Sequence, residues 1–404
     1  LALHLMGTQF ARTGIVVQTG IATDAPMERF WKVLVDEGRI VSLLDFDNRQ
    51  RIFPGVHSKM KFCLLTLREQ NSQPSSEVQC GFFLRKIEDA RDPSRVYRLQ
   101  IRDLATINPN TKQPPVCRNK RDLDLLLGVQ TRFPVLARDS ESSWRARAWV
   151  ALTSEGASKH FVRQIDLPLD GTWDESMYYT VGRTRFAPLM EAKQIHQFNP
   201  AFGTYEGVTG RDWDNGSPKA VEPGSLGTSL AYPRYWASEV FVEDFYLSKN
   251  HTHQWIPVIR DVTNATNERT AIACLLPRVG MVQPLNGIAV ADAQEALWLV
   301  AVLNTFILDY CARQKVPGSH LNVTIFAQLP VPPKQGGWAE RIVIAEALEL
   351  SYTVAGLQHL AQEVGYSGPP FPWNADRRFW LRAELDALYF HLYGIERDDV
   401  DYIM

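Results

Sequence analysis

The sequence lacks the features of membrane proteins, of disulfide-rich secreted domains and of zinc proteins. No apolar run approaches the roughly 20 residues that span a bilayer, and no secretory signal opens the chain. Its five cysteines are an odd number, are scattered and include no Cys-x-x-Cys pair. The pattern predicts neither a disulfide framework nor a zinc site, and it favours a reducing, cytoplasmic location away from membranes.

A strong net charge of one sign is also missing. The formal net charge is −2, which does not indicate a general binder of polyanions. Its distribution is uneven: residues 85–147 hold 14 Lys/Arg and 8 Asp/Glu (net +6), whereas residues 335–404 hold 5 and 11 (net −6). A basic middle is compatible with a local nucleic-acid surface or with an ordinary solvated surface of mixed charge.

The composition that remains is that of a globular protein. With 404 residues, of which 45% are hydrophobic and 22% charged, the chain is long enough for two or three domains. It opens on "LALHLMGTQF" without an initiator Met, and it stops on "RDDVDYIM" inside a predicted helix. These ends predict a fragment of a larger protein.

The N-terminal region has the pattern of part of an α/β sheet. Short apolar runs predict strands at 13–20, 40–46 and 61–67, and a helix is predicted over 25–38 between the first two. Phe30, Val33 and Leu34 would form the buried face of that helix, and Gly38 would end it. The run 78–87 is expected to pair back as a hairpin.

The rest of the chain predicts mixed structure followed by helices. A helix is expected at 119–131, and a region rich in Trp and Tyr with short strands extends to about residue 290. Residues 206–230 are expected to form a loop. Three helices should follow, at 291–312, 338–363 and 375–393. The first would begin with a capping box of Asp292 and Glu295. The third would have Asn374 as N-cap and Gly394 as stop, and its buried face would contain Leu381, Leu385, Leu388 and Leu392.

Three stretches carry a resemblance to a known family: "GIVVQTGIATD", "IVSLLDFDNRQRIFPGVHSKMKFCLLTL" and "LNTFILDYCARQKVPGSHLNVTIFAQLPVPP". They resemble N6-adenine DNA methyltransferases, more narrowly the large single-chain enzymes of Type IIG restriction–modification and related phage-defence systems. The resemblance implies an α/β plus α+β chain. Residues 1–90 would be the terminal strands of a Rossmann-like catalytic sheet, residues 91–333 a mixed target-recognition domain, and residues 334–404 a helical C-terminal region.

The resemblance also implies what lies outside the chain. The family's glycine-rich S-adenosylmethionine motif and its Asn/Asp-Pro-Pro-aromatic catalytic motif would precede residue 1, because neither occurs here and Asn108-Pro109-Asn110-Thr111 is better explained as a turn. The intact protein would methylate adenine in double-stranded DNA with S-adenosylmethionine, whereas this fragment would bind no cofactor and would not be catalytic. Its partners would be DNA and the N-terminal remainder of the same polypeptide. The rival hypotheses are a noncatalytic DNA-binding specificity subunit and a nuclease, for which no P-D…(D/E)-x-K arrangement appears.

An aromatic residue that contacts the flipped base is implied in the loop before the last catalytic strand. Phe53, beside the Pro54-Gly55 turn, and Phe62 are the candidates. Phe62 lies inside an apolar strand and is better explained as a core residue. Phe53 is therefore the predicted base contact.

The stretch "RDVTNATNERTAI" (260–272) is the clearest candidate for DNA contact. Asn264, Asn267 and Arg269 suit base edges, and Thr270 suits phosphates. The alternative is an ordinary Asn-rich turn whose short side chains bond their own backbone.

Two further sets of cations are predicted to contact DNA. Lys193 is a candidate, whereas neighbouring His196 fits a core position equally well and has no second ligand at metal-binding spacing. Arg313, Lys315 and His320 would face phosphates at the end of the 291–312 helix. The alternative for Arg313 and Lys315 is that they only neutralise the helix C-terminus.

Overall fold

The computed structural model describes residues 11–69, 76–133, 135–137, 144, 146–168, 170–173, 177–334 and 336–404. The chain divides into two compact units. The first contains residues 1–142, 313–317 and 328–330, and the second contains residues 143–312, 318–327 and 331–404. The three domains predicted from the resemblance remain a prediction.

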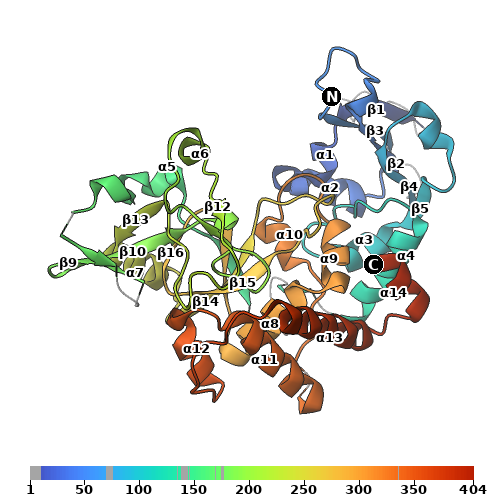
Figure 1. Cartoon of the computed structure of the whole chain (residues 1–404). Helices are drawn as coiled ribbons and strands as arrows, with labels where there is room; N and C mark the ends of the chain where they lie inside the picture. The colour runs from blue at the N-terminus through green and yellow to red at the C-terminus, as the bar shows by residue number, and fades with distance from the viewer. Residues whose placement is uncertain are drawn as a thin grey trace. The chain divides into compact units, whose positions relative to one another are not determined.

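The first unit is built on a five-stranded sheet in the order β1-β3-β2-β4-β5, drawn in blue and cyan in Figure 1. The pairs β1–β3, β3–β2 and β4–β5 are antiparallel, and β2–β4 is parallel. The three predicted strands are therefore present and lie in one sheet. Its elements are β1 (Arg12–Gln18), α1 (Gly20–Thr23), η1 (Ala25–Met27), α2 (Glu28–Asp36), β2 (Ile40–Asp47), η2 (Asn48–Gln50), β3 (Lys61–Arg68), β4 (Glu77–Leu84), η3 (Ile87–Arg91), β5 (Tyr97–Gln100), α3 (Ile101–Ile107) and α4 (Lys120–Arg132).

Helix α2 buries a different face from the predicted one. Trp31, Leu34 and Val35 are buried, and the Trp31 indole donates a hydrogen bond to the carbonyl of Lys112. Phe30 and Val33 are instead 36% and 52% exposed. The helix thus carries apolar side chains on two sides, of which the described residues cover one.

Strand β4 does not form the predicted hairpin. It pairs with β2 and β5 rather than with β3, so it follows β3 in sequence but lies beyond β2 in the sheet. The β2–β4 register shifts between Leu44 and Phe46, and Phe83 adopts a φ of +56° at this bulge. Helix α4 fits its prediction, because the Asn119 side chain accepts a hydrogen bond from the amide of Asp122.

The second unit contains three sheets of its own, in the orders β7-β13-β10-β9-β8 with β16 on β10, β15-β14-β17-β6, and β11-β12. The expected loop at 206–230 contains a short helix and a strand. The elements up to the last strand are β6 (Arg147–Val150), α5 (Ser154–Ala157), η4 (Ser158–His160), β7 (Val162–Arg163), η5 (Gln164–Asp166), β8 (Thr172–Trp173), β9 (Tyr179–Val181), β10 (Thr184–Met190), η6 (Ala192–Gln194), β11 (Gly203–Thr204), α6 (Gly210–Asp214), β12 (Lys219–Ala220), β13 (Tyr235–Ser238), α7 (Glu239–Ser248), β14 (Trp255–Arg260), β15 (Ala273–Pro277), β16 (Gly280–Met281) and β17 (Leu285–Ala289).

The predicted 291–312 helix is broken into α8 (Ala293–Leu303) and α9 (Phe306–Arg313), which are bent by 67°. Asn304 lies at the break and is buried. Its side chain accepts from the Ala273 amide (3.0 Å) and donates to the Ala273 carbonyl (2.9 Å), so it bonds to β15 as a strand neighbour would. At the start of α8, Asp292 accepts from the Glu295 amide as predicted, whereas Glu295 accepts from Ala291 instead of closing the capping box.

The remaining helices are α10 (Val323–Ala327), α11 (Gly337–Ser351), η7 (Ala355–Leu357), α12 (Gln358–Glu363), α13 (Ala375–Tyr393) and α14 (Arg397–Ile403). Of these, α11, α12 and α13 contact the buried α8. Asn374 and Gly394 (φ +64°) delimit α13 as predicted. Its fully buried side chains follow a spacing of four residues, so Tyr389 and Tyr393 take the places predicted for Leu388 and Leu392, beside Leu381 and Leu385.

No single described helix is both long and apolar enough to cross a membrane. Only α8 and α9 taken together reach that length and composition, and they are sharply bent and almost wholly buried.

Candidate functional site

The first unit places polar and aromatic residues along one edge of its sheet. Strand β1 runs in the same direction as β2, because both are antiparallel to β3, and β4 is parallel to β2. The carboxyl ends of these three strands therefore lie at the same edge, which we call the carboxyl edge. Ligands of open α/β sheets bind outside such an edge.

Asp45 is the most buried charged residue at the carboxyl edge. Its carboxylate accepts from the Thr19 hydroxyl (2.5 Å) and from the Phe83 amide (3.1 Å), and the Lys61 ammonium is 4.0 Å away. Burial raises the pKa of Asp45, and the charge of Lys61 opposes that rise. Burial likewise lowers the pKa of Lys61. Neither residue was singled out from the sequence, although an acid inside the apolar run 40–46 is a signal of this kind.

Phe83 is held in a left-handed backbone conformation opposite Asp45. A φ of +56° is unfavourable for an aromatic residue by roughly 1–2 kcal/mol. The bulge turns the Phe83 ring toward two cations, since the Lys61 ammonium lies 4.2 Å and the Arg118 guanidinium 5.8 Å from its centroid. Bulges and strained residues of this kind are frequent beside functional sites.

The predicted base contact, Phe53, lies in the loop between β2 and β3, at the carboxyl edge. Three hydrogen bonds from the fully buried Asn48 hold this loop: its amide group donates to the carbonyls of Phe53 (3.0 Å) and Val56 (2.9 Å), and its oxygen accepts from the Phe53 amide (3.0 Å). The Phe53 side chain is 40% exposed. Phe53 is therefore presented on a backbone that one buried side chain fixes.

Two further aromatic rings support Phe53. Its ring meets Phe62 edge-on with centroids 4.8 Å apart, and Phe62 is stacked on Phe46 at 5.3 Å. Phe62 is half-buried between them. This agrees with its interpretation as a packing residue, and it leaves Phe53 as the outermost ring of the row.

In the second unit, the structure brings two predicted DNA-contact segments together. Asp261 and His320 face each other with Oδ1 and Nδ1 2.9 Å apart, and Val262 pairs with His320 as an isolated bridge. The Thr263 amide donates to the carbonyl of Ser319, and the Leu321 amide to that of Asp261. We call residues 261–270 and 318–321 the paired loops. His320 is exposed on them, as is Asn267.

The Asn264 side chain is engaged within its own turn. Its oxygen accepts from the amide (2.9 Å) and hydroxyl (2.8 Å) of Thr266, and its carbonyl accepts from Asn267. This is the local side-chain-to-backbone bonding that was the alternative to a DNA contact.

Arg269 and Thr270 were predicted to contact DNA, and the structure corrects this. Arg269 is only 6% exposed, with its guanidinium 3.6 Å from the centroid of the Phe306 ring. Thr270 is fully buried, and its amide donates to the carboxylate of Asp309 (2.6 Å). Both residues fasten the loop to α9 and do not reach a surface.

Burial also raises the pKa of neighbouring Asp386 to about 6, although its carboxylate accepts from the Phe306 amide.

Lys315 is also corrected, because it is 6% exposed and lies in the interior of the first unit. Its ammonium donates to the carbonyl of Ile107, the last residue of α3, and to the Asn108 side chain (2.7 Å). It thus neutralises a helix C-terminus, but that of α3 and not of its own helix. Arg313 is half-buried in the last turn of α9. The Asn108 carbonyl accepts from Thr111 and Lys112, which confirms the turn predicted there.

Lys193 is exposed, and its ammonium donates to the carbonyls of Gly216 (2.7 Å) and Asn215 (3.5 Å) beyond α6. His196 is half-buried with its ring against Phe202, and burial lowers its pKa to about 4. A neutral, partly packed imidazole fits the core alternative. Within the described residues, no three His, Cys, Asp or Glu side chains are placed to hold a metal ion, and all five cysteines are free and buried.

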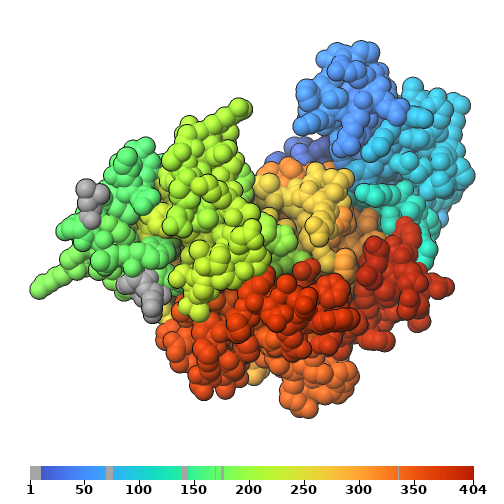
Figure 2. Space-filling model, viewed as in Figure 1, coloured from blue at the N-terminus to red at the C-terminus, as the bar shows by residue number. Residues whose placement is uncertain are grey.

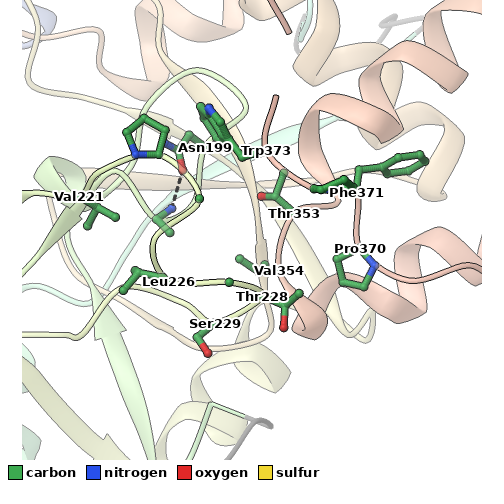
Figure 3. Close-up of a pocket in the computed structure, with 15 residues that line it drawn as sticks. Asn199, Val221, Leu226, Thr228, Ser229, Thr353, Val354, Pro370, Phe371 and Trp373 are labelled. Carbon is green, nitrogen blue, oxygen red and sulfur yellow. Dashed lines mark hydrogen bonds between the residues drawn. The ribbon is translucent and has the colours of Figure 1, made fainter. Parts of the chain in front are cut away.

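A cavity of about 340 Å³ opens elsewhere in the second unit (Figure 3). Its wall is contributed by the segments 199–201, 221–229, 353–354 and 370–373. The lining side chains are apolar or neutral, among them Val221, Leu226 and Trp373, and Asn199 uses its oxygen to accept from the Ala201 amide (2.9 Å). With no cation in its wall, this cavity does not fit a phosphate or another anion.

Comparison with known proteins gives matches only among solved structures. No protein-family model matches the chain, and no curated protein matches it. The DNA complex of the Type IIL restriction–modification enzyme MmeI is similar over 95% of this chain and 47% of that one, with a TM-score of 0.44 and 11% identity. The Type IIG restriction endonuclease BpuSI is similar over 94% and 47%, with a TM-score of 0.29 and 11% identity.

A third similar structure is the DNA-bound ATP-dependent Type ISP restriction–modification enzyme LlaBIII, over 86% of this chain and 26% of that one, with a TM-score of 0.39 and 8% identity. The chain therefore spans less than half the length of each of these proteins. These likenesses are remote in sequence and loose in fold.

Proposed function

We propose that this chain is the DNA-recognition portion of an S-adenosylmethionine-dependent adenine-N6 DNA methyltransferase of a restriction–modification or phage-defence system. The observation that carries the proposal is the presentation of Phe53 at the carboxyl edge. An enzyme that modifies a base extrudes it from the duplex and stacks it on aromatic side chains. Phe53 meets that need, since it is an exposed ring on a backbone fixed by Asn48 and supported by Phe62.

The catalytic sheet would be completed by the N-terminal remainder of the polypeptide. In the described residues β1 is the edge strand of the sheet, yet its sequence "GIVV" is typical of a strand buried on both faces. Val16 is 55% exposed, and Phe30 and Val33 of α2 are exposed as well. Exposed apolar side chains at the open edge of the sheet and on α2 indicate that further strands and helices pack against this unit. Those added elements would hold S-adenosylmethionine.

The second unit would supply the DNA-binding surface. Asn267 and His320 are both exposed on the paired loops, where the His320 imidazole lies against Asp261. Lys193 is exposed in η6, and its ammonium contacts the carbonyls of Gly216 and Asn215. An asparagine amide suits the edge of adenine, whereas a histidine or lysine suits the backbone. Arg269, Thr270 and Lys315 have structural roles and are not part of this surface.

The test is methyl transfer by the intact protein, from labelled S-adenosylmethionine to duplex DNA, with the product base analysed for N6-methyladenine. Phe53→Ala should lower the rate by roughly 5- to 150-fold, because one lost base stack is worth about 1–3 kcal/mol. Phe379→Ala is the matched control, since Phe379 is an exposed aromatic side chain on α13 of the second unit, and its rate should be unchanged.

Two outcomes would contradict the proposal. An unchanged rate in the Phe53 variant would remove this residue from base contact. An intact protein that binds DNA but transfers no methyl group would instead favour the noncatalytic specificity subunit.

A further inference from the structure

The hairpin of β9 and β10 extends from the second unit as a narrow finger. Thr184 pairs with Val181, Arg185 with Thr180 and Phe186 with Tyr179, around a two-residue turn of Gly182 and Arg183. Gly182 has a φ of +56°, which places glycine at the first central position of the turn, as tight hairpins require. The hairpin projects at the far left of Figure 1, and its tip stands clear of the surface in Figure 2.

The base of the finger is braced on both strands. The Tyr179 hydroxyl donates to the carbonyl of Pro168 (2.5 Å), and its ring lies 5.8 Å from the buried Trp236. On β10, Arg185 is held by Glu239 (2.7 Å) and lies 4.0 Å over the Tyr178 ring. These contacts fix the direction of the hairpin, so its tip is a preorganised support.

The tip itself carries a cation with no competing acid. Residues 177–190 contain two arginines and no Asp or Glu. Arg185 is engaged at the base, whereas Arg183 is exposed and has no hydrogen bond or ion pair among the described residues. An unpaired guanidinium on a rigid, projecting support is placed to bind an anion outside the protein.

We infer that the β9–β10 hairpin is a DNA-contacting finger, and that Arg183 binds a phosphate of double-stranded DNA. This inference rests on the proposed function, and it assigns a contact that the sequence did not predict. One guanidinium can read a guanine edge with two hydrogen bonds, but only where the tip of the hairpin enters the major groove. A phosphate contact requires only that the tip meets the outside of the duplex, so we assign Arg183 to the DNA backbone.

The experiment measures binding of the full chain to a mixed-sequence duplex of about 30 base pairs, between about 50 and 200 mM salt. The test variants are Arg183→Asp and Arg183→Asn, because Gly-Asp and Gly-Asn pairs both suit a two-residue hairpin turn. Arg183→Lys keeps the charge. The matched control is Arg341→Asp, which reverses the charge at an exposed arginine on α11 of the same unit.

Losing one phosphate contact lowers the slope of log K against log salt by about 0.9. The Asp and Asn variants should show this lower slope, and Arg183→Lys and Arg341→Asp should keep the slope of the unmodified chain. Melting temperatures of all variants should agree, which separates lost contacts from lost folding.

Equal slopes in all variants would refute the phosphate contact of Arg183. The proposed function would remain intact, because the unmodified chain would still bind DNA. Absence of salt-dependent binding by the unmodified chain would overturn both. Tighter binding to a single strand of the same length would overturn the assignment to double-stranded DNA.

Discussion

Replacing Asn48 by Ala should release the loop that presents Phe53. Asn48 is fully buried and makes three hydrogen bonds to the backbone of Phe53 and Val56. A typical intramolecular hydrogen bond contributes about 1 kcal/mol net, so the three together hold the loop closed by about 3 kcal/mol. The strands β2 and β3 that flank the loop are paired independently of Asn48. The loss should therefore be local, and the sheet should remain folded.

Hydrogen exchange measures this loss directly. Local opening free energies set the exchange rates of backbone amides, and every 1.4 kcal/mol changes the equilibrium about tenfold. The amide of Phe53, which donates to the Asn48 oxygen, should exchange about 100-fold faster in Asn48→Ala. Amides within β2 and β3 should exchange at their original rates.

The control is Asn267→Ala, which removes an exposed asparagine from the paired loops and should leave exchange in residues 48–60 unchanged. The reasoning is refuted if the Phe53 amide of Asn48→Ala exchanges within about threefold of the original rate, since about 0.6 kcal/mol is too little for three bonds. Under the proposed function, the same variant of the intact protein should slow methyl transfer without weakening DNA binding.

Two further predictions concern buried charges. Lys315→Ala should lower the free energy of unfolding by about 2–3 kcal/mol, because it leaves the Ile107 carbonyl and the Asn108 side chain without their charged donor. DNA titrations of this variant should show an unchanged salt slope. A lowered slope at an unchanged melting temperature would instead support the original prediction that Lys315 contacts a phosphate. Asp386 has a folded pKa raised to about 6, so its folded state holds a proton that the unfolded state releases above about pH 4. Stability should therefore fall by roughly 2–3 kcal/mol as pH rises from 4 to 7, and Asp386→Asn should abolish that fall in urea titrations. A pH dependence identical in both proteins would contradict the raised pKa.

Local signals in the sequence were sufficient for the first three strands and for several helix boundaries. Asn119, Asn374 and Gly394 lie at the helix boundaries where capping chemistry predicted them. The strands at 13–20, 40–46 and 61–67 were recognisable because their apolar runs are bounded by Gly and polar residues. These features depend on neighbours a few residues away, which a single sequence contains.

Features that depend on distant partners were not predicted. The break at Asn304 arises because its side chain bonds to Ala273, 31 residues earlier. The order of β2, β3 and β4 is likewise a property of the assembled sheet, and the Phe83 bulge appears only once β4 lies beside β2. An apolar run predicts a strand but not which strand it pairs with.

The predicted site was limited by the same cause. Arg269, Thr270 and Lys315 are polar residues in segments that read as loops or helix ends, and such residues are mostly exposed. Their burial follows from Phe306, Asp309 and Asn108, the last of which is 207 residues from Lys315. Asn48 was missed for the converse reason, since nothing in the local sequence distinguishes a buried polar residue that holds a loop from one in solvent. Asp45 differs, because it lies inside the apolar run 40–46, and that position is a local signal of burial.

The polar residues that were predicted to contact DNA thus fall into two groups, according to whether their hydrogen-bonding groups already have partners within the protein. Lys315 and Thr270 make their hydrogen bonds at buried positions, and the Arg269 guanidinium is covered by Phe306. Transferring Lys315 or Thr270 to DNA would leave buried groups without partners, which costs about 1–3 kcal/mol for each group. The side-chain bonds of Asn264 to Thr266 are instead at the surface. Arg183 at the tip of the hairpin and Asn267 on the paired loops carry no such cost, because both are exposed. Phe53 combines the two properties, since its backbone is bound to Asn48 while its ring remains exposed. A residue that the protein holds in place but leaves uncovered is the kind that can meet a base without first being released.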